Sequence, residues 1–206
     1  MKTYITLLII TISISLQAQK INQKKVHCVE AKIGLPEYPI DKTTLPEIIS
    51  SFGNNYEQVP NRYFINGKVK EGYEKNPPLL EIKYKTLGVS FYYFGGDSTQ
   101  IIKAVRLSKP FKVKTKTNII LGKSKLGDVL KLYDNNTKIS ISATDNDHTV
   151  ANINRYNMTS TGISFSSKMA NHSKDNFPYK YEELENLIID EIYISNINYL
   201  NRILLD

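Results

Sequence analysis

Two stretches of this chain, LPEIISSFGNN at residues 45–55 and LGDVLKLYDNN at residues 126–136, align with each other without a gap. Apolar residues match apolar residues, an acidic residue matches an acidic one, an aromatic residue matches an aromatic one, and both copies end on Asn-Asn. Internal similarity of this kind is typical of folds that are built from repeated units. The sequence therefore predicts two repeat units of the same plan, over residues 43–110 and residues 111–195.

Each unit is predicted to begin with a short helix. In the first unit, Thr44 and Glu47 have the spacing of a capping box, and Gly53 is placed to end the helix in a left-handed conformation. In the second unit, Ser124 is the expected helix cap. The apolar stripes expected to face the core are Leu45, Ile48, Ile49 and Phe52 in the first helix, and Leu126, Val129, Leu130 and Tyr133 in the second.

Each helix is followed by a predicted antiparallel meander of three or four strands. Asn66-Gly67 predicts a type I′ hairpin turn, and the polar stretch at residues 169–185 reads as an inserted loop. With helices on one face of such a sheet, the predicted fold class is α+β, and the two units can join edge to edge. Alternation of apolar and polar residues predicts strands at residues 80–84, 89–94, 101–107, 139–141, 153–158, 163–165 and 188–195.

The repeat also assigns the two faces of the predicted sheet. The residues between the core positions are expected on an open face, where Tyr92, Arg106 and Tyr193 are the predicted anchors of a binding surface. Lys83 and Lys85 are expected to steer an acidic partner towards it. The alternatives are an ordinary solvated face or a face covered by the inserted loop. The predicted core pairs are Ile82 with Tyr156, Tyr84 with Met158, Val89 with Ile163, Phe91 with Phe165, Val105 with Ile192, and Leu107 with Ile194.

The two ends of the chain carry their own signals. Residues 1–18 combine a basic start, a short uncharged apolar run and a small residue, which predicts a signal peptide that is cleaved after Ala18. No later segment is long and apolar enough to cross a membrane. The expected location is therefore periplasmic or secreted. Residues 19–42 are predicted as a lead-in strand and residues 196–206 as a short closing helix.

The net charge and the few Cys and His residues limit the expected partners and the possible metal or catalytic sites. The net charge is +7, and an exported protein seldom meets nucleic acid, so the expected partner is a protein or an anionic cell-envelope component. Cys28 is the only cysteine and is predicted to be buried. His27, His148 and His172 lack metal-ligand spacing, and no nucleophile elbow is present, so neither a cofactor nor a metal site is predicted.

The stretch LGKSKLGDV at residues 121–129, followed by Tyr133, is similar to the opening of small exported bacterial proteins. The arrangement over residues 43–107 and 124–195 resembles the β-lactamase-inhibitor-protein-like fold and the SmpA/OmlA-type small outer-membrane lipoproteins. In the inhibitor family, two helix-plus-sheet repeats form a concave sheet that grips a partner protein. This chain differs because Asp134 replaces the usual Gly, and because it lacks both the lipid-attachment Cys and the disulfides of the inhibitors.

Three functions are compatible with these patterns. The first is an exported binding or assembly module that holds a protein or a cell-envelope ligand on the open sheet face. The second is a periplasmic hydrolase that uses dispersed carboxylates such as Glu81, Asp190 and Glu191. The third is a stoichiometric inhibitor or immunity-type protein. The absence of recognisable catalytic motifs favours a protein that is not an enzyme.

Overall fold

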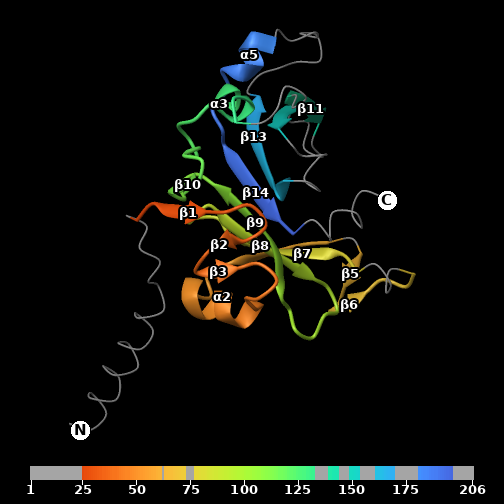
Figure 1. Cartoon of the computed structure of the whole chain (residues 1–206). Coiled ribbons are helices and arrows are strands. Elements are labelled where there is room, and N and C mark those ends of the chain that lie inside the picture. Colours follow the sequence, from red (N-terminus) through yellow and green to blue (C-terminus); the bar gives the residue numbers. More distant parts are fainter. Residues whose placement is uncertain are drawn as a thin grey trace, which may run out of the picture.

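The computed structural model describes residues 25–61, 63–72, 77–132, 139–143, 149–153, 161–169 and 181–196. It is an α+β fold in which an eight-stranded antiparallel sheet is accompanied by three two-stranded ribbons and short helices (Figure 1). The described helices are α2 (Leu45–Phe52), α3 (Leu126–Leu130) and α5 (Tyr181–Glu185). None of these is long and apolar enough to cross a membrane.

The strands are short, and most pair with the next strand along the chain. They are β1 (His27–Val29), β2 (Gly34–Leu35), β3 (Tyr38–Pro39), β4 (Glu57–Val59), β5 (Phe64–Ile65), β6 (Lys68–Val69), β7 (Leu79–Tyr84), β8 (Val89–Phe94), β9 (Ile102–Ser108), β10 (Val113–Thr115), β11 (Ile139–Ala143), β12 (Thr149–Ile153), β13 (Ile163–Met169) and β14 (Glu191–Ser195). The large sheet has the order β11-β12-β13-β14-β9-β8-β7-β4. Its two meanders meet where β9 pairs with β14, for example at Val105 with Ile194.

Helix α2 begins with the predicted capping box. The backbone amide of Thr44 donates to the Glu47 carboxylate at 2.7 Å, which satisfies a donor that the first turn leaves free. Gly53 ends the helix with φ 85° and ψ 180°, so the predicted left-handed helical conformation is wrong, although the φ value is positive. The Gly53 carbonyl accepts a hydrogen bond from the Tyr84 hydroxyl at 2.9 Å, which joins the end of α2 to β7.

Helix α3 is capped differently from the prediction. The Ser124 hydroxyl oxygen accepts a hydrogen bond from the Ile120 amide at 3.0 Å, so it serves the preceding turn rather than the helix. Lys125 is the N-cap residue, and its backbone amide donates to the Asp128 carboxylate at 2.9 Å. The carboxylate on the third helical residue thus supplies the capping bond whatever side chain stands at the cap.

An equivalent backbone hydrogen bond ties the start of each helix, α2 and α3, to the segment that leads into a strand of the large sheet. The first amide of α2, that of Leu45, donates to Gln100 just before β9 at 2.9 Å. The first amide of α3, that of Leu126, donates to Leu187 just before β14 at 2.9 Å. Each helix therefore begins beside one of the two strands that meet in the middle of the sheet.

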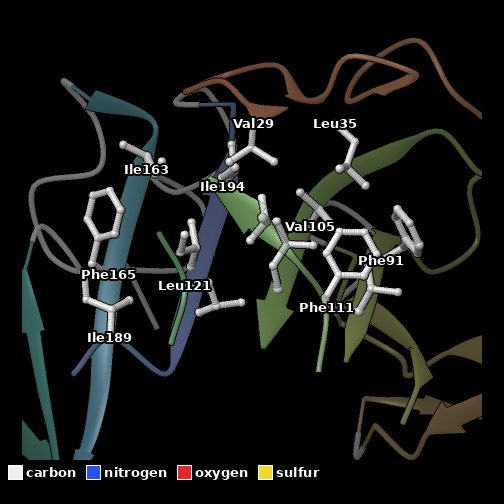
Figure 2. Packing of buried hydrophobic residues seen from close by; sticks show 14 of the residues in the cluster. Val29, Leu35, Phe91, Val105, Phe111, Leu121, Ile163, Phe165, Ile189 and Ile194 are labelled. Carbon is white, nitrogen blue, oxygen red and sulfur yellow. The ribbon is translucent and has the colours of Figure 1, made fainter. Parts of the chain in front are cut away.

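One face of the large sheet is packed into a continuous hydrophobic core. The described members of the predicted core pairs are at most 5 % exposed: Ile82, Tyr84, Val89, Phe91, Val105, Leu107, Ile163, Phe165, Ile192 and Ile194. In the predicted helix stripes, Leu45, Ile48, Phe52, Leu126 and Val129 are buried, whereas Ile49 and Leu130 are partly buried. Figure 2 shows several of them with Leu35, Phe111 and Leu121 in one cluster. Tyr133, Tyr156 and Met158, which were also predicted to face the core, lie outside the described residues.

An aromatic group anchors α2 on this core. The Phe52 ring lies with its centroid 5.0 Å from that of Phe91 and 5.4 Å from that of Tyr84, in edge-on and tilted arrangements. Such geometry suits the charge distribution of aromatic rings and adds to the burial of their surface. Leu126 and Val129 of α3 belong to the same buried cluster.

Several segments differ from the predicted elements. The lead-in segment contains β1 and the small β2–β3 ribbon rather than one strand. Of the strand predicted at residues 153–158, only Ile153 is described, and it ends β12 (Thr149–Ile153). The predicted loop at residues 169–185 ends in helix α5. The type I′ turn is confirmed, because Asn66 and Gly67 both have positive φ between β5 and β6. The predicted signal peptide and closing helix lie outside the described residues.

Candidate binding surface

The three predicted anchor residues come together on the face of the large sheet that is opposite the core, called the outer face here. Tyr92 lies on β8, Arg106 on β9 and Tyr193 on β14, and these strands are neighbours in the sheet. Arg106 is directly opposite Tyr193 in the β9–β14 register. Alternation along each strand therefore places all three side chains on one face.

Their side chains form a compact group in which the arginine contacts both rings. The Tyr92 and Tyr193 ring centroids are 5.6 Å apart with the planes at 73°. The guanidinium carbon of Arg106 lies 5.3 Å from the Tyr92 centroid and 5.9 Å from the Tyr193 centroid. Both distances fall in the range of cation–π attraction. We refer to Tyr92, Arg106 and Tyr193 as the Tyr–Arg cluster.

Two glutamates border the Tyr–Arg cluster. Glu191 on β14 places a carboxylate oxygen 3.5 Å from Nε of Arg106, which makes an ion pair. Glu81 on β7 is directly opposite Tyr92 in the β7–β8 register. The two acids and the arginine carry a formal charge of about −1 together when all three are ionised. Strand alternation in the sequence already predicted Glu191 on the same face as Tyr193, and both glutamates were candidate carboxylates of the hydrolase alternative, but neither was predicted as part of the binding surface.

The cluster is less open than predicted. Tyr92 is only 7 % exposed, so its prediction as a surface anchor is corrected. The cause is packing, because its ring is covered by the Tyr193 ring and by the Arg106 guanidinium. The Arg106 side chain remains 39 % exposed, and Tyr193 is half-buried. Arg106 and Tyr193 are therefore the members of the cluster that a partner can touch.

Three polar atoms in this region are buried without a hydrogen-bond partner in the part of the chain that the structure describes. They are Oε1 of Glu81, the hydroxyl of Tyr92 and Nε of Arg106. A buried polar group without a partner costs about 1–3 kcal/mol, so such groups in a folded protein usually bind water or a ligand. The cluster thus retains hydrogen-bonding capacity that its own side chains leave unused.

Burial also changes the ionisation of the two tyrosines. Removal from water raises the pKa of Tyr193 to about 12, although the nearby Arg106 charge acts in the opposite direction. The pKa of Tyr92 is raised for the same reason. Both rings are therefore neutral hydrogen-bonding groups over the physiological pH range.

The raised pKa of Tyr193 predicts a loss of stability in alkali. Between its ordinary pKa of 10.0 and its folded value of about 12, the unfolded chain loses the Tyr193 proton while the folded protein keeps it. The stability that the neutral Tyr193 ring contributes to the folded protein is complete below pH 10.0 and is lost as the pH rises to about 12. We expect Tyr193→Phe to make the fall in unfolding free energy shallower, measured by urea denaturation at several pH values. An identical pH profile for the variant and the wild type would contradict this.

The two predicted steering lysines lie on β7 and at its end rather than in the Tyr–Arg cluster. Lys83 is opposite Ser90 on one side and Glu57 on the other in the strand registers. Nζ of Lys85 forms an ion pair with Glu57 at 2.5 Å on the exposed edge near β4. Exposed pairs of this kind contribute little to stability, but Glu57 partly neutralises the charge that was expected to attract a partner.

The structure does not bring Cys28 and His27 together into a reactive pair. Cys28 is half-exposed on the outer side of β1, so the prediction that it is buried is wrong, whereas His27 beside it points inward and stacks on Phe111. The adjacent imidazole and thiol therefore lie on opposite sides, as strand geometry requires. No group of three His, Cys, Asp or Glu side chains suited to a metal ion occurs among the described residues.

Comparison with known proteins gives no assignment. No protein-family model matches the chain, and a search of curated proteins gave no match. Among solved structures, the chain is similar to the uncharacterised protein YfeY from Escherichia coli, with 12 % sequence identity and a TM-score of 0.48. The similarity covers 84 % of this chain and 100 % of that one.

Proposed function

We propose that this protein is an exported binding module that recognises a protein or a cell-envelope ligand through the outer face of its large sheet. The observation that carries the proposal is the position of Arg106, whose guanidinium lies against both the Tyr92 and Tyr193 rings while part of its side chain stays exposed. Arginine and tyrosine are the residue types that dominate the energetic centres of protein interfaces.

The packing of the cluster suits recognition. Two rings and the Glu191 carboxylate restrict Arg106, so little side-chain entropy remains to be lost when a partner docks. The planar guanidinium presents several fixed donors, which suits a carboxylate or a backbone carbonyl on a partner. A protein partner with a loop that presents backbone carbonyls fits this chemistry best.

The proposal includes a two-repeat architecture, with one helix and one meander in each unit. Three matched features support it: the carboxylate caps of α2 and α3, the bonds from Leu45 and Leu126 to the sheet, and the pairing of β9 with β14. This arrangement would be akin to the β-lactamase-inhibitor-protein-like fold and to the SmpA/OmlA-type lipoproteins. An inhibitor or immunity role would then be one form of the same binding function.

The hydrolase alternative has one observation in its favour, which is the pair of carboxylates at Glu81 and Glu191 beside the Tyr–Arg cluster. Arg106 weakens it, because its guanidinium already engages the Glu191 carboxylate in an ion pair. Among the described residues that line an apolar hollow beside Phe94, Asp97 is the one acid, and its carboxylate already accepts hydrogen bonds from Thr99. We therefore favour binding over hydrolysis.

A charge-matched pair of variants tests the binding function. Wild-type protein, Arg106→Gln and the control Lys68→Gln, which lies in the exposed β5–β6 hairpin, are immobilised and exposed to envelope extract. Proteins retained by wild type and by the control are identified by mass spectrometry, purified, and titrated against all three. We expect Arg106→Gln to weaken the affinity by about thirtyfold or more, as loss of a central interface residue does.

Two further measurements interpret that result. Thermal denaturation of each variant shows whether Arg106→Gln remains folded, and Tyr92→Phe removes the buried hydroxyl while it keeps the ring. Unchanged affinity of folded Arg106→Gln for the purified partner would refute the assignment of this face. The Ala substitution of Tyr92 is unsuitable as a binding test, because removing a buried ring would itself destabilise the fold.

A further inference from the structure

A second surface lies on the two-stranded ribbon of β1 and β10, away from the Tyr–Arg cluster. The two strands run parallel, and Figure 1 places them side by side at one flank of the molecule. Along β10, Val113 and Thr115 are buried, whereas Lys112, Lys114 and Lys116 are exposed. The alternation of a strand therefore sends all three lysines to the same outer side. We call Lys112, Lys114 and Lys116 with the outer side of β1 the basic ribbon.

The ribbon unites two basic regions that are far apart in the sequence. The amide of His27 donates to the Lys112 carbonyl at 2.9 Å, so the N-terminal strand enters the fold beside the β10 lysines. Lys25 precedes this strand and is also exposed. In the sequence, Lys25 follows directly on Lys24, and the chain around β10 is rich in lysine. Parallel pairing of β1 with β10 thus concentrates charge that the sequence alone presents as dispersed.

Few acids offset this charge. Glu30 pairs with Lys116 at 2.6 Å and Glu37 pairs with Lys25 at 3.3 Å. Within the described part of the chain, Lys112 and Lys114 make no ion pair. Four lysines against two glutamates leave the ribbon with a formal charge of about +2. The Lys112 and Lys114 ammonium groups are therefore available to an external anion.

The composition of the ribbon indicates what kind of anion it fits. It contains no arginine fork and no aromatic side chain, which are the usual means of recognising one defined protein or phosphate group. Lysines on flexible stems instead suit a diffuse, extended anionic surface. Val26, which is 50 % exposed and directly precedes β1, adds an apolar side chain that follows Lys25 in the sequence. Basic residues with an adjacent apolar residue are the combination that favours a lipid bilayer over a soluble polyanion.

We propose that the basic ribbon is a contact surface for the anionic headgroups of a phospholipid bilayer. The ribbon holds the protein at the membrane surface, and the outer face of the large sheet is a separate surface. Binding of this kind depends on charge, falls as salt screens the lysines, and does not require insertion of the fold. The proposal rests on β1, β10 and their lysines alone, and it is independent of the function proposed for the Tyr–Arg cluster.

Vesicle co-sedimentation of the full chain tests the proposal. Vesicles of phosphatidylcholine with about one-third phosphatidylglycerol are compared with pure phosphatidylcholine vesicles at low salt. The triple variant Lys112→Gln, Lys114→Gln, Lys116→Gln is matched by Lys42→Gln, Lys68→Gln, Lys70→Gln, which removes the same charge from exposed positions elsewhere. We expect the ribbon variant to bind anionic vesicles at least about tenfold more weakly than wild type, since each lysine near such a surface contributes roughly fivefold. The control variant should lose much less.

Each other outcome overturns the proposal. Equal losses in the two triple variants would mean that net charge alone governs binding. Wild type that binds both kinds of vesicle equally, or neither, would remove the ionic contact. If the protein binds soluble polyphosphate but not anionic vesicles, the ribbon is a site for a free polyanion. A wild-type salt series keeps the test valid if the ribbon variant misfolds, because binding that persists at about 1 M salt contradicts a screened contact.

Discussion

Phe91→Ala is expected to lower the unfolding free energy by about 3–5 kcal/mol, which is the usual cost of removing a buried aromatic ring. Phe91 is 1 % exposed, and its ring lies against both Phe52 of α2 and Tyr84 of β7. The substitution removes the transfer free energy of the ring and leaves a cavity between helix and sheet. It also deprives Phe52 of an edge-on neighbour, so α2 should loosen from the sheet.

Urea denaturation followed by circular dichroism measures this change. Ile65→Ala is the matched control, because Ile65 is 56 % exposed in the β5–β6 hairpin and its truncation removes little buried surface. We expect the control to shift the unfolding free energy by less than about 0.5 kcal/mol. A Phe91→Ala loss as small as that of the control would mean that the ring is not part of the core, and the face assignment of β8 would fail.

The face assignments could be predicted because they depend on local rules. Side chains alternate between the two faces of a strand, which put Phe91 and Phe165 on the core face. The similarity between the two halves of the sequence supported each assignment. The capping box of α2 was equally local, since Thr44 and Glu47 are three residues apart. Where two local rules competed, prediction failed: Ser124 has a good capping side chain, but the preceding turn uses its hydroxyl.

Contacts between distant segments were less accessible. The hydrophobic pattern gave Tyr92, Arg106 and Tyr193 a common face, but not the antiparallel register of β9 and β14 that places Arg106 opposite Tyr193. The burial of Tyr92 follows from that register, because the Tyr193 ring comes from the strand beyond β9. The parallel pair of β1 and β10 was also missed, since nothing in a three-residue strand specifies its partner.

Comparing Ala substitutions at two glycines separates the free-energy cost of a steric clash with nearby backbone from the cost of a positive φ value. Gly88 lies in the turn between β7 and β8 with φ 72°, and Gly67 lies in the type I′ turn with φ 76°. A Cβ on Gly88 would come within 2.8 Å of the Lys109 carbonyl oxygen, and it would also collide with the Ser108 carbonyl. A Cβ on Gly67 would have no atom within 4 Å.

Gly88→Ala is therefore expected to lower the unfolding free energy by about 2–4 kcal/mol, and Gly67→Ala by about 1 kcal/mol. Both variants place an alanine at positive φ, so the difference between them measures the steric conflict with the backbone after β9. The hydrogen bond from the Ser108 amide to the Gly88 carbonyl, 2.8 Å long, should be the contact that gives way. Urea denaturation gives both values, and amide hydrogen exchange at Ser108 reports the contact directly. Equal losses in the two variants, with Ser108 still protected, would show that the turn can move away from β9. The tight approach of the β7–β8 turn to the end of β9 would then not be a fixed feature of the fold.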